Sequence, residues 1–164
     1  RRDKKILDVV SKFKCPFVIT HSRGNSQNNP NDINKVDRNA AIRAIKIGLW
    51  NPAVQVAVFA PQTNNNWAPN QLQNFIEYIK SNYANAVKTN RIYITGFSMG
   101  GFGTWSYLEE FGYQDSSVAA AVTMAGAPEN IDNVEPLKMM PFWAFHGDRY
   151  PTVSVSRSIQ VVAF

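Results

Sequence analysis

Cysteine is nearly absent from this sequence of 164 residues, since Cys15 is the only one. A single cysteine excludes a disulfide within the chain and a thiolate metal cluster. The two histidines, His21 and His146, are far apart in the sequence, so the sequence predicts no zinc site. Glycine-rich loops with the spacing of a phosphate-binding motif are also missing. We therefore expect no metal and no other cofactor.

Long hydrophobic runs are missing too. No apolar stretch approaches the ~18 residues of a membrane-spanning helix, so we expect no contact with a membrane. The net charge of +5 comes partly from the cluster at residues 1–5, and no basic stripe with interleaved aromatic residues follows it, which argues against nucleic-acid binding. An apolar content of 45% with 18% charged residues is typical of a globular protein, and we expect residues 1–164 to form a single domain.

Short apolar runs alternate with helical patterns along the chain. Runs rich in β-branched and aromatic residues predict strands at 17–20, 54–60, 91–95, 118–124 and 142–145. Apolar residues at helical spacing predict helices at 40–50, 70–83 and 100–111, and a last helix that begins near Val155. This alternation predicts an α/β fold with a doubly wound, mostly parallel sheet. Active sites of such sheets lie at the carboxyl ends of the strands, here followed by polar loops such as 21–34, 61–70 and 146–153.

One turn between a predicted strand and a predicted helix has the spacing G-x-S-x-G, at Gly96, Ser98 and Gly100. This pattern is typical of the sharp turn that presents a nucleophilic serine. The flanking glycines lack a Cβ and so let the strand and the helix approach closely. The Met99 N–H then lies at a helix N-terminus, where it can donate to the oxyanion of an acyl-transfer intermediate. We predict Ser98 as a nucleophile and Met99 as an oxyanion donor, with a passive serine in a glycine-rich turn as the alternative.

The segment around this turn, RIYITGFSMGGFGTW at 91–105, resembles the nucleophile region of a family of α/β-hydrolase esterases. That family includes polyhydroxybutyrate depolymerases, feruloyl esterases and predicted peptidase-like hydrolases. Further segments are similar to parts of the same family in the same order along the chain: FVITHSRG at 17–24, FAPQ at 59–62 and FWAFHG at 142–147. The resemblance implies an α/β-hydrolase fold and hydrolysis of carboxylic esters without a cofactor. It alone suggests a secreted or periplasmic location.

The resemblance also implies further site residues. The family's His-Gly-x-Gly oxyanion loop corresponds to His21-Ser22-Arg23-Gly24, so the second oxyanion donor is expected to be the backbone N–H of Arg23. Trp67 follows the next strand, near the expected pocket. It either stacks on an aromatic or sugar group of the substrate or covers the edge of the sheet.

The acid position departs from the family pattern. Tyr150 stands where the family has the aspartate that orients the catalytic histidine. The nearest carboxylate is Asp148, two residues earlier. Asp148 either substitutes for the missing acid, because hydrolases of the same geometry differ in the position of this group, or it caps a turn.

The general base is the second departure. The fold places its triad in the order serine, acid, histidine, yet no histidine follows His146. His146 precedes the acid position, where it is expected to form local hydrogen bonds, and His21 lies in the oxyanion loop. We therefore expect the catalytic histidine outside the 164 residues, in a domain that lacks its C-terminal strand and histidine loop.

Three functions are compatible with these residues. The favoured hypothesis is a serine esterase that acts on a small-molecule or polymeric ester through an acyl-enzyme on Ser98. The substitutions at Tyr150 and Ser22 favour an alternative, a catalytically impaired relative used for binding or assembly. A peptidase of the same fold is the third, because ester and amide hydrolysis use the same groups.

Overall fold

The structure is a computed structural model that describes residues 15–23, 40–63, 65–112, 114, 117–130 and 137–162. The described strands are β1 (Cys15–Arg23), β2 (Ala57–Phe59), β3 (Gln62–Thr63), β4 (Val87–Phe97), β5 (Ala120–Met124) and β6 (Phe142–Phe145). The helices are α2 (Ala40–Lys46), α3 (Pro69–Asn82), α4 (Met99–Phe111) and α5 (Val155–Val162).

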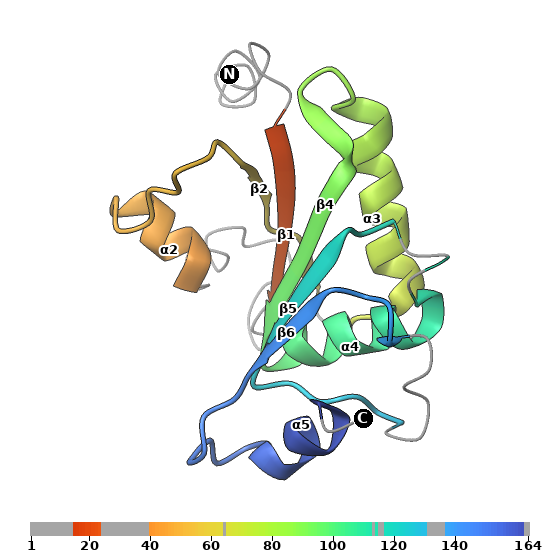
Figure 1. Cartoon of the computed structure of the whole chain (residues 1–164). Helices are drawn as coiled ribbons and strands as arrows, with labels where there is room; N and C mark the ends of the chain where they lie inside the picture. Colours follow the sequence, from red (N-terminus) through yellow and green to blue (C-terminus); the bar gives the residue numbers. More distant parts are fainter. Residues whose placement is uncertain are drawn as a thin grey trace.

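The strands form one parallel sheet in the order β2-β1-β4-β5-β6, and β3 pairs with the end of β1. Strands β2 and β4 pair with opposite edges of β1, so the chain passes from one side of β1 to the other between these two strands. Figure 1 shows α3 and α4 on one side of the strands and α2 on the other. This arrangement confirms the predicted doubly wound, parallel α/β sheet.

The core lies between the sheet and the two helices α3 and α4. On β4, Ile92 and Ile94 point to this side and are buried, and Trp105 of α4 packs edge-on against Phe142 of β6. The apolar stripe of α3 supplies further buried side chains, namely Leu72, Ile76 and Ile79. Each contributes about 1.5–3 kcal/mol on burial. The core therefore fixes α4 on β4, the strand that leads into this helix.

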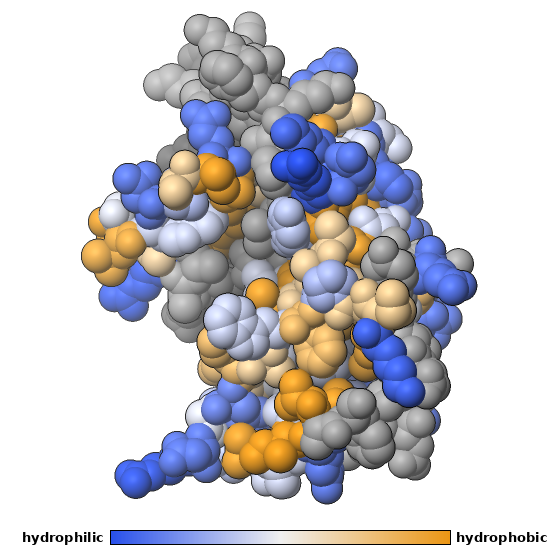
Figure 2. Space-filling view, viewed as in Figure 1, coloured by the Kyte–Doolittle hydropathy of each residue, from blue (hydrophilic) through white to orange (hydrophobic). Residues whose placement is uncertain are grey.

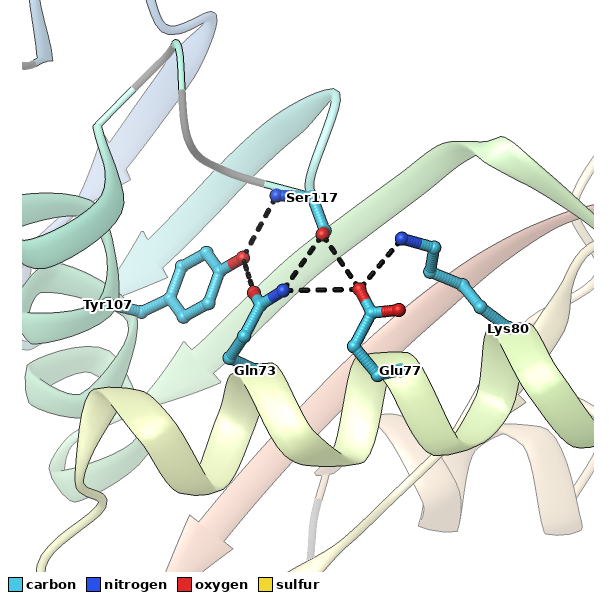
Figure 3. Close-up of polar contacts among 5 residues, drawn as sticks. All are labelled: Gln73, Glu77, Lys80, Tyr107 and Ser117. Carbon is cyan, nitrogen blue, oxygen red and sulfur yellow. Dashed lines mark hydrogen bonds and ion pairs between the residues drawn. The ribbon is translucent and has the colours of Figure 1, made fainter.

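A polar network joins α3, α4 and the segment that leads into β5 (Figure 3). The buried Tyr107 hydroxyl donates to Gln73 Oε1 at 2.7 Å and accepts from the Ser117 N–H at 3.1 Å. Gln73 Nε2 donates to Ser117 Oγ at 3.0 Å, and the Ser117 hydroxyl donates to Glu77 Oε1 at 3.2 Å. The hydrogen bond from Lys80, at 2.7 Å, is the main cause that lowers the pKa of Glu77. The network holds α4 to α3 along one side.

The opposite face of the sheet is more open. On β6, Trp143 and Phe145 are 66% and 46% exposed, and their rings lie 4.7 Å apart. Figure 2 shows apolar surface over the region where β6 and α5 lie. The side chains of β6 are half-buried on one face and exposed on the other, whereas the nearly continuous apolar sequence of 142–145 predicted a strand covered on both faces.

Several element boundaries differ from the sequence prediction. Strand β2 is only Ala57–Phe59, and Val54, at the start of the predicted strand, is 65% exposed. Helix α2 ends at Lys46 and not at 50, since Gly48 has a φ of 74° that ends the helix and leaves Leu49 78% exposed. In both places the apolar residues that suggested a longer element lie on the surface.

Candidate functional site

Ser98 is the single residue between strand β4 and helix α4. Its φ of 53° and ψ of −113° are unusual for a residue with a side chain and cost about 1–3 kcal/mol. Two backbone hydrogen bonds hold this conformation: the Ser98 N–H donates to the Met124 carbonyl at 2.8 Å, and the Ser98 carbonyl accepts from the Phe102 N–H at 2.9 Å. The strained backbone is thus fixed from β5 on one side and from α4 on the other.

Three glycines allow the close packing around Ser98. A Cβ at Gly96 would overlap the backbone carbonyl of Gly100, which explains why a glycine precedes the serine by two residues. A Cβ at Gly101 would lie 2.8 Å from the Met124 carbonyl oxygen, and one at Gly126 would overlap the backbone of Gly101. Gly126 follows β5, and sequence reasoning assigned it no role, because nothing local shows that its backbone meets α4.

The two backbone N–H groups that the sequence predicted as oxyanion donors belong to α4 and β1. Met99 is the first residue of α4, so its N–H has no partner within the helix. On β1, His21 pairs in register with Gly96, which carries Ser22 and Arg23 past the turn at Ser98. The sequence predicted a loop from residue 21, but β1 continues to Arg23 because β3 provides a partner, with Arg23 opposite Thr63. Gly24 of the expected oxyanion loop, and the rest of the polar loop up to residue 34, lie outside the described part of the chain.

A cavity of about 590 Å³ opens beside Ser98. Its wall combines the turn, one side of α4 and the loops that follow β3, β5 and β6. The lining residues are Asn66, Trp67, Phe97, Ser98, Met99, Phe102, Gly103, Ser106, Glu129, Thr152 and Val153. Trp67 is 7% exposed, lines this cavity and also belongs to the buried core.

Tyr150 lies directly against the serine. Its hydroxyl donates a hydrogen bond to Ser98 Oγ at 3.1 Å. The ring packs edge-on against Phe97, with 5.8 Å between centroids, and against His146, at 6.0 Å. The sequence identified Tyr150 as a substitution at the acid position, but nothing in it indicated a contact with Ser98. Asp148, the candidate acid, is exposed in the same turn and forms no hydrogen bond or ion pair with any residue that the structure describes.

His146 is engaged through both ring nitrogens. Nε2 lies 2.9 Å from the Val153 carbonyl oxygen and Nδ1 lies 2.7 Å from Ser158 Oγ. A carbonyl oxygen only accepts, so Nε2 carries a proton and donates it. The Ser158 hydroxyl lies also 3.0 Å from the Gly126 carbonyl oxygen. His146 therefore has the local hydrogen bonds that the sequence predicted for it. Through Ser158 it links α5 to the turn after β6.

Residues 33–141 match the model of a protein family that is described as α/β hydrolase of unknown function (DUF915). The match covers more than half of the chain. The chain belongs to this family of α/β hydrolases. No curated protein matches it.

Solved structures support the α/β-hydrolase fold. The chain is similar to a thermostable esterase, with a TM-score of 0.67 and 26% identity over 93% of this chain and 44% of the esterase. It is also similar to a phospholipase/carboxylesterase from Dyadobacter fermentans, with a TM-score of 0.58 and 23% identity over 94% of this chain and 76% of that one. The second likeness shows the fold alone. The chain spans less than half of the length of the thermostable esterase.

In this α/β hydrolase, the segment that follows β5 forms part of the cavity wall. Glu129 lines the cavity, and the Asn130 N–H donates to Glu109 Oε1 of α4 at 3.2 Å. Burial raises the pKa of Glu109 from its ordinary value of 4.5, and the hydrogen bond from Asn130 partly offsets this effect. Arg157 of α5 donates to the Pro128 carbonyl at 2.8 Å. The segment is thus tied to both α4 and α5.

Neither a group of metal-ligating side chains nor a membrane-spanning helix is present in the described part of the chain. Among those residues, no three His, Cys, Asp or Glu side chains lie close enough together to hold a metal ion. None of the described helices combines the length and the apolar character that crossing a membrane requires.

Proposed function

We propose that this protein is a serine hydrolase that cleaves carboxylic esters through an acyl-enzyme on Ser98. The observation that carries the proposal is the position of Ser98: alone between β4 and α4, with a φ of 53°, at the edge of a cavity of about 590 Å³. A strained serine at this junction is the geometry of a nucleophile elbow. The likeness to a thermostable esterase supports an ester as the substrate.

In the proposed reaction, Ser98 Oγ attacks the ester carbonyl and the alcohol leaves. The backbone N–H groups of Met99 and Arg23 are the proposed donors to the oxyanion. Water then attacks the acyl-enzyme, and the acid is released with Ser98 restored. Proton transfer in both steps is assigned to a histidine.

That histidine is proposed to lie outside the 164 residues. The ring nitrogens of His146 are both engaged, with Val153 and Ser158. His21 precedes Ser98 in the chain, whereas this fold takes its histidine from the part of the chain after the acid. Asp148 is the proposed acid, and a turn-capping residue is its alternative role.

The cavity wall supports an apolar or aromatic group on the substrate. Trp67, Phe97 and Phe102 supply most of the aromatic surface, while Glu129 is the charged side chain that lines the cavity among the described residues. Flat aromatic side chains such as these favour stacking against an acyl or alcohol group of similar shape.

The direct test replaces Ser98 by alanine in the protein as the cell makes it. Hydrolysis of p-nitrophenyl acetate and of a feruloyl ester is measured, together with covalent labelling by a fluorophosphonate probe. We expect Ser98→Ala to lose labelling and to reduce turnover by at least about 10³-fold. Ser106→Ala is the matched control, since Ser106 lines the same cavity from the next turns of α4. Equal turnover by the wild type and Ser98→Ala would refute the proposal.

A second function has one specific observation in its favour. Tyr150 donates to Ser98 Oγ from the position where the resembled family has its acid, so no carboxylate stands at that position to orient a histidine. Failure of the wild-type protein to react with the fluorophosphonate would support this function. Hydrolysis of amide substrates at rates above those for esters would instead indicate a peptidase.

A further inference from the structure

We propose that Tyr150 is a further catalytic residue, whose hydroxyl hydrogen-bonds to Ser98 Oγ in the free enzyme and speeds release of the acyl group. This inference rests on the proposed function of Ser98. Its basis is the 3.1 Å hydrogen bond from the Tyr150 hydroxyl to Ser98 Oγ.

The surroundings of Tyr150 hold its hydroxyl in place. The Tyr150 N–H donates to the Gly147 carbonyl at 3.1 Å, which closes the turn after β6. Two rings pack edge-on against the phenol ring, those of Phe97 and His146. His146 is itself fixed by hydrogen bonds to Val153 and Ser158. The hydroxyl is thus directed at Ser98 before any substrate binds, with little conformational freedom left to lose.

The hydrogen bond changes during the reaction because the acceptor changes. In acylation, the Ser98 Oγ–carbon bond forms, the bond from carbon to the alcohol oxygen breaks, and the Ser98 proton passes through the base to the leaving alcohol. Oγ is then an ester oxygen, whose lone pair is delocalised into the carbonyl group and accepts a hydrogen bond poorly. In deacylation, a water oxygen bonds to the carbon, the carbon–Oγ bond breaks, and a water proton returns through the base to Oγ.

Tyr150 therefore loses its acceptor on acylation and regains it on deacylation. The contact stabilises the free enzyme relative to the acyl-enzyme. In both transition states Oγ is partly bonded to carbon, so part of the hydrogen-bond free energy is already lost on the way to acylation. That part slows acylation, and the part regained in the transition state of deacylation speeds deacylation. The ratio of the acylation rate constant to the deacylation rate constant then changes by a factor that corresponds to the free energy of one neutral hydrogen bond, about 2- to 12-fold.

The experiment compares wild type and Tyr150→Phe in the protein as the cell makes it. Stopped-flow hydrolysis of p-nitrophenyl acetate gives the acylation rate constant from the burst and the deacylation rate constant from the steady state. We expect the ratio of acylation to deacylation to rise by about 2- to 12-fold in Tyr150→Phe, with slower deacylation and fluorophosphonate labelling that is no slower than in wild type. Tyr78→Phe is the control, because this exposed tyrosine of α3 lies in no wall of the cavity.

A ring-fluorinated tyrosine at position 150 provides a second variant that keeps the size of the side chain. Its hydroxyl is a stronger donor, so we expect the ratio to fall below that of wild type. An unchanged ratio in both variants, or a fall of both rate constants by the same factor, would overturn the role of Tyr150 and leave Ser98 as the nucleophile. Absence of labelling and turnover in the wild type would overturn both proposals.

Discussion

Replacing Gly126 by alanine tests whether the segment after β5 holds the turn at Ser98. The added Cβ would overlap the Gly101 backbone and lie 2.6 Å from the Phe102 nitrogen. These are backbone atoms of α4, so no side-chain rotation relieves the contact. The φ of Gly126 is not positive, and the cost is therefore steric and not conformational.

The expected loss of stability follows from the cost of overpacking, about 1–3 kcal/mol. For a chain of this size, each kcal/mol lowers the melting temperature by about 2–4 °C, which predicts a total shift of about 2–12 °C. The same displacement moves the Met124 carbonyl that accepts the Ser98 N–H, so we expect slower fluorophosphonate labelling below the melting temperature.

The assay is thermal unfolding by circular dichroism, with Gly147→Ala as the matched control. A Cβ at Gly147 meets no atom within 4 Å, so its melting temperature is expected to stay within about 1–2 °C of wild type. Equal melting temperatures for the two variants would refute the close contact between Gly126 and α4.

Two further substitutions test the elements around the site. Tyr107→Phe removes the acceptor of the Ser117 N–H and the donor to Gln73, and we expect urea unfolding to show a loss of about 1–3 kcal/mol; a loss below 0.5 kcal/mol would contradict the network. Glu109→Gln tests the raised pKa of Glu109. Burial favours the protonated form of the Glu109 carboxyl in the folded state. The protonated carboxyl therefore contributes to the free energy of unfolding below the ordinary pKa of 4.5, and this contribution is lost as the pH rises through the higher pKa of the folded protein. We expect the wild type to lose stability relative to Glu109→Gln over that range, whereas parallel urea midpoints against pH would contradict the shift.

The sequence predicted best what depends on neighbours in the chain. The G-x-S-x-G spacing at Ser98, together with the strand-like residues before it and the helical spacing after it, predicted a strand, a sharp turn and a helix, and the structure has Ser98 at that junction. Helix α3 was placed to within one residue at each end, since its apolar stripe is a local signal. The boundaries failed where apolar residues are exposed, as at Leu49 and Val54, because hydrophobicity alone does not show which side chains find a partner.

The contacts that complete the site join residues far apart in the chain, and for that reason no spacing predicted them. Tyr150 and Ser98 are separated by 52 positions, and Tyr107 and Gln73 by 34. The resemblance to known esterases identified position 150 as that of the acid, but a phenol at this position hydrogen-bonds differently from a carboxylate. It donates to Oγ directly, whereas a carboxylate accepts from a histidine.

The turn at Ser98 is held by β5 as much as by its own glycines. Its strained backbone persists because the Met124 carbonyl accepts the Ser98 N–H and because Gly126 lets the next segment pack on Gly101. A G-x-S-x-G pattern that lacked an acceptor equivalent to the Met124 carbonyl and a glycine equivalent to Gly126 would lose both of these contacts. We expect the backbone of its serine to relax to the conformation of an ordinary helix start. The strained turn at Ser98 is therefore specified jointly by its own residues and by the end of β5, which is why a mutation at Gly126, outside the motif, is expected to change the reactivity of Ser98.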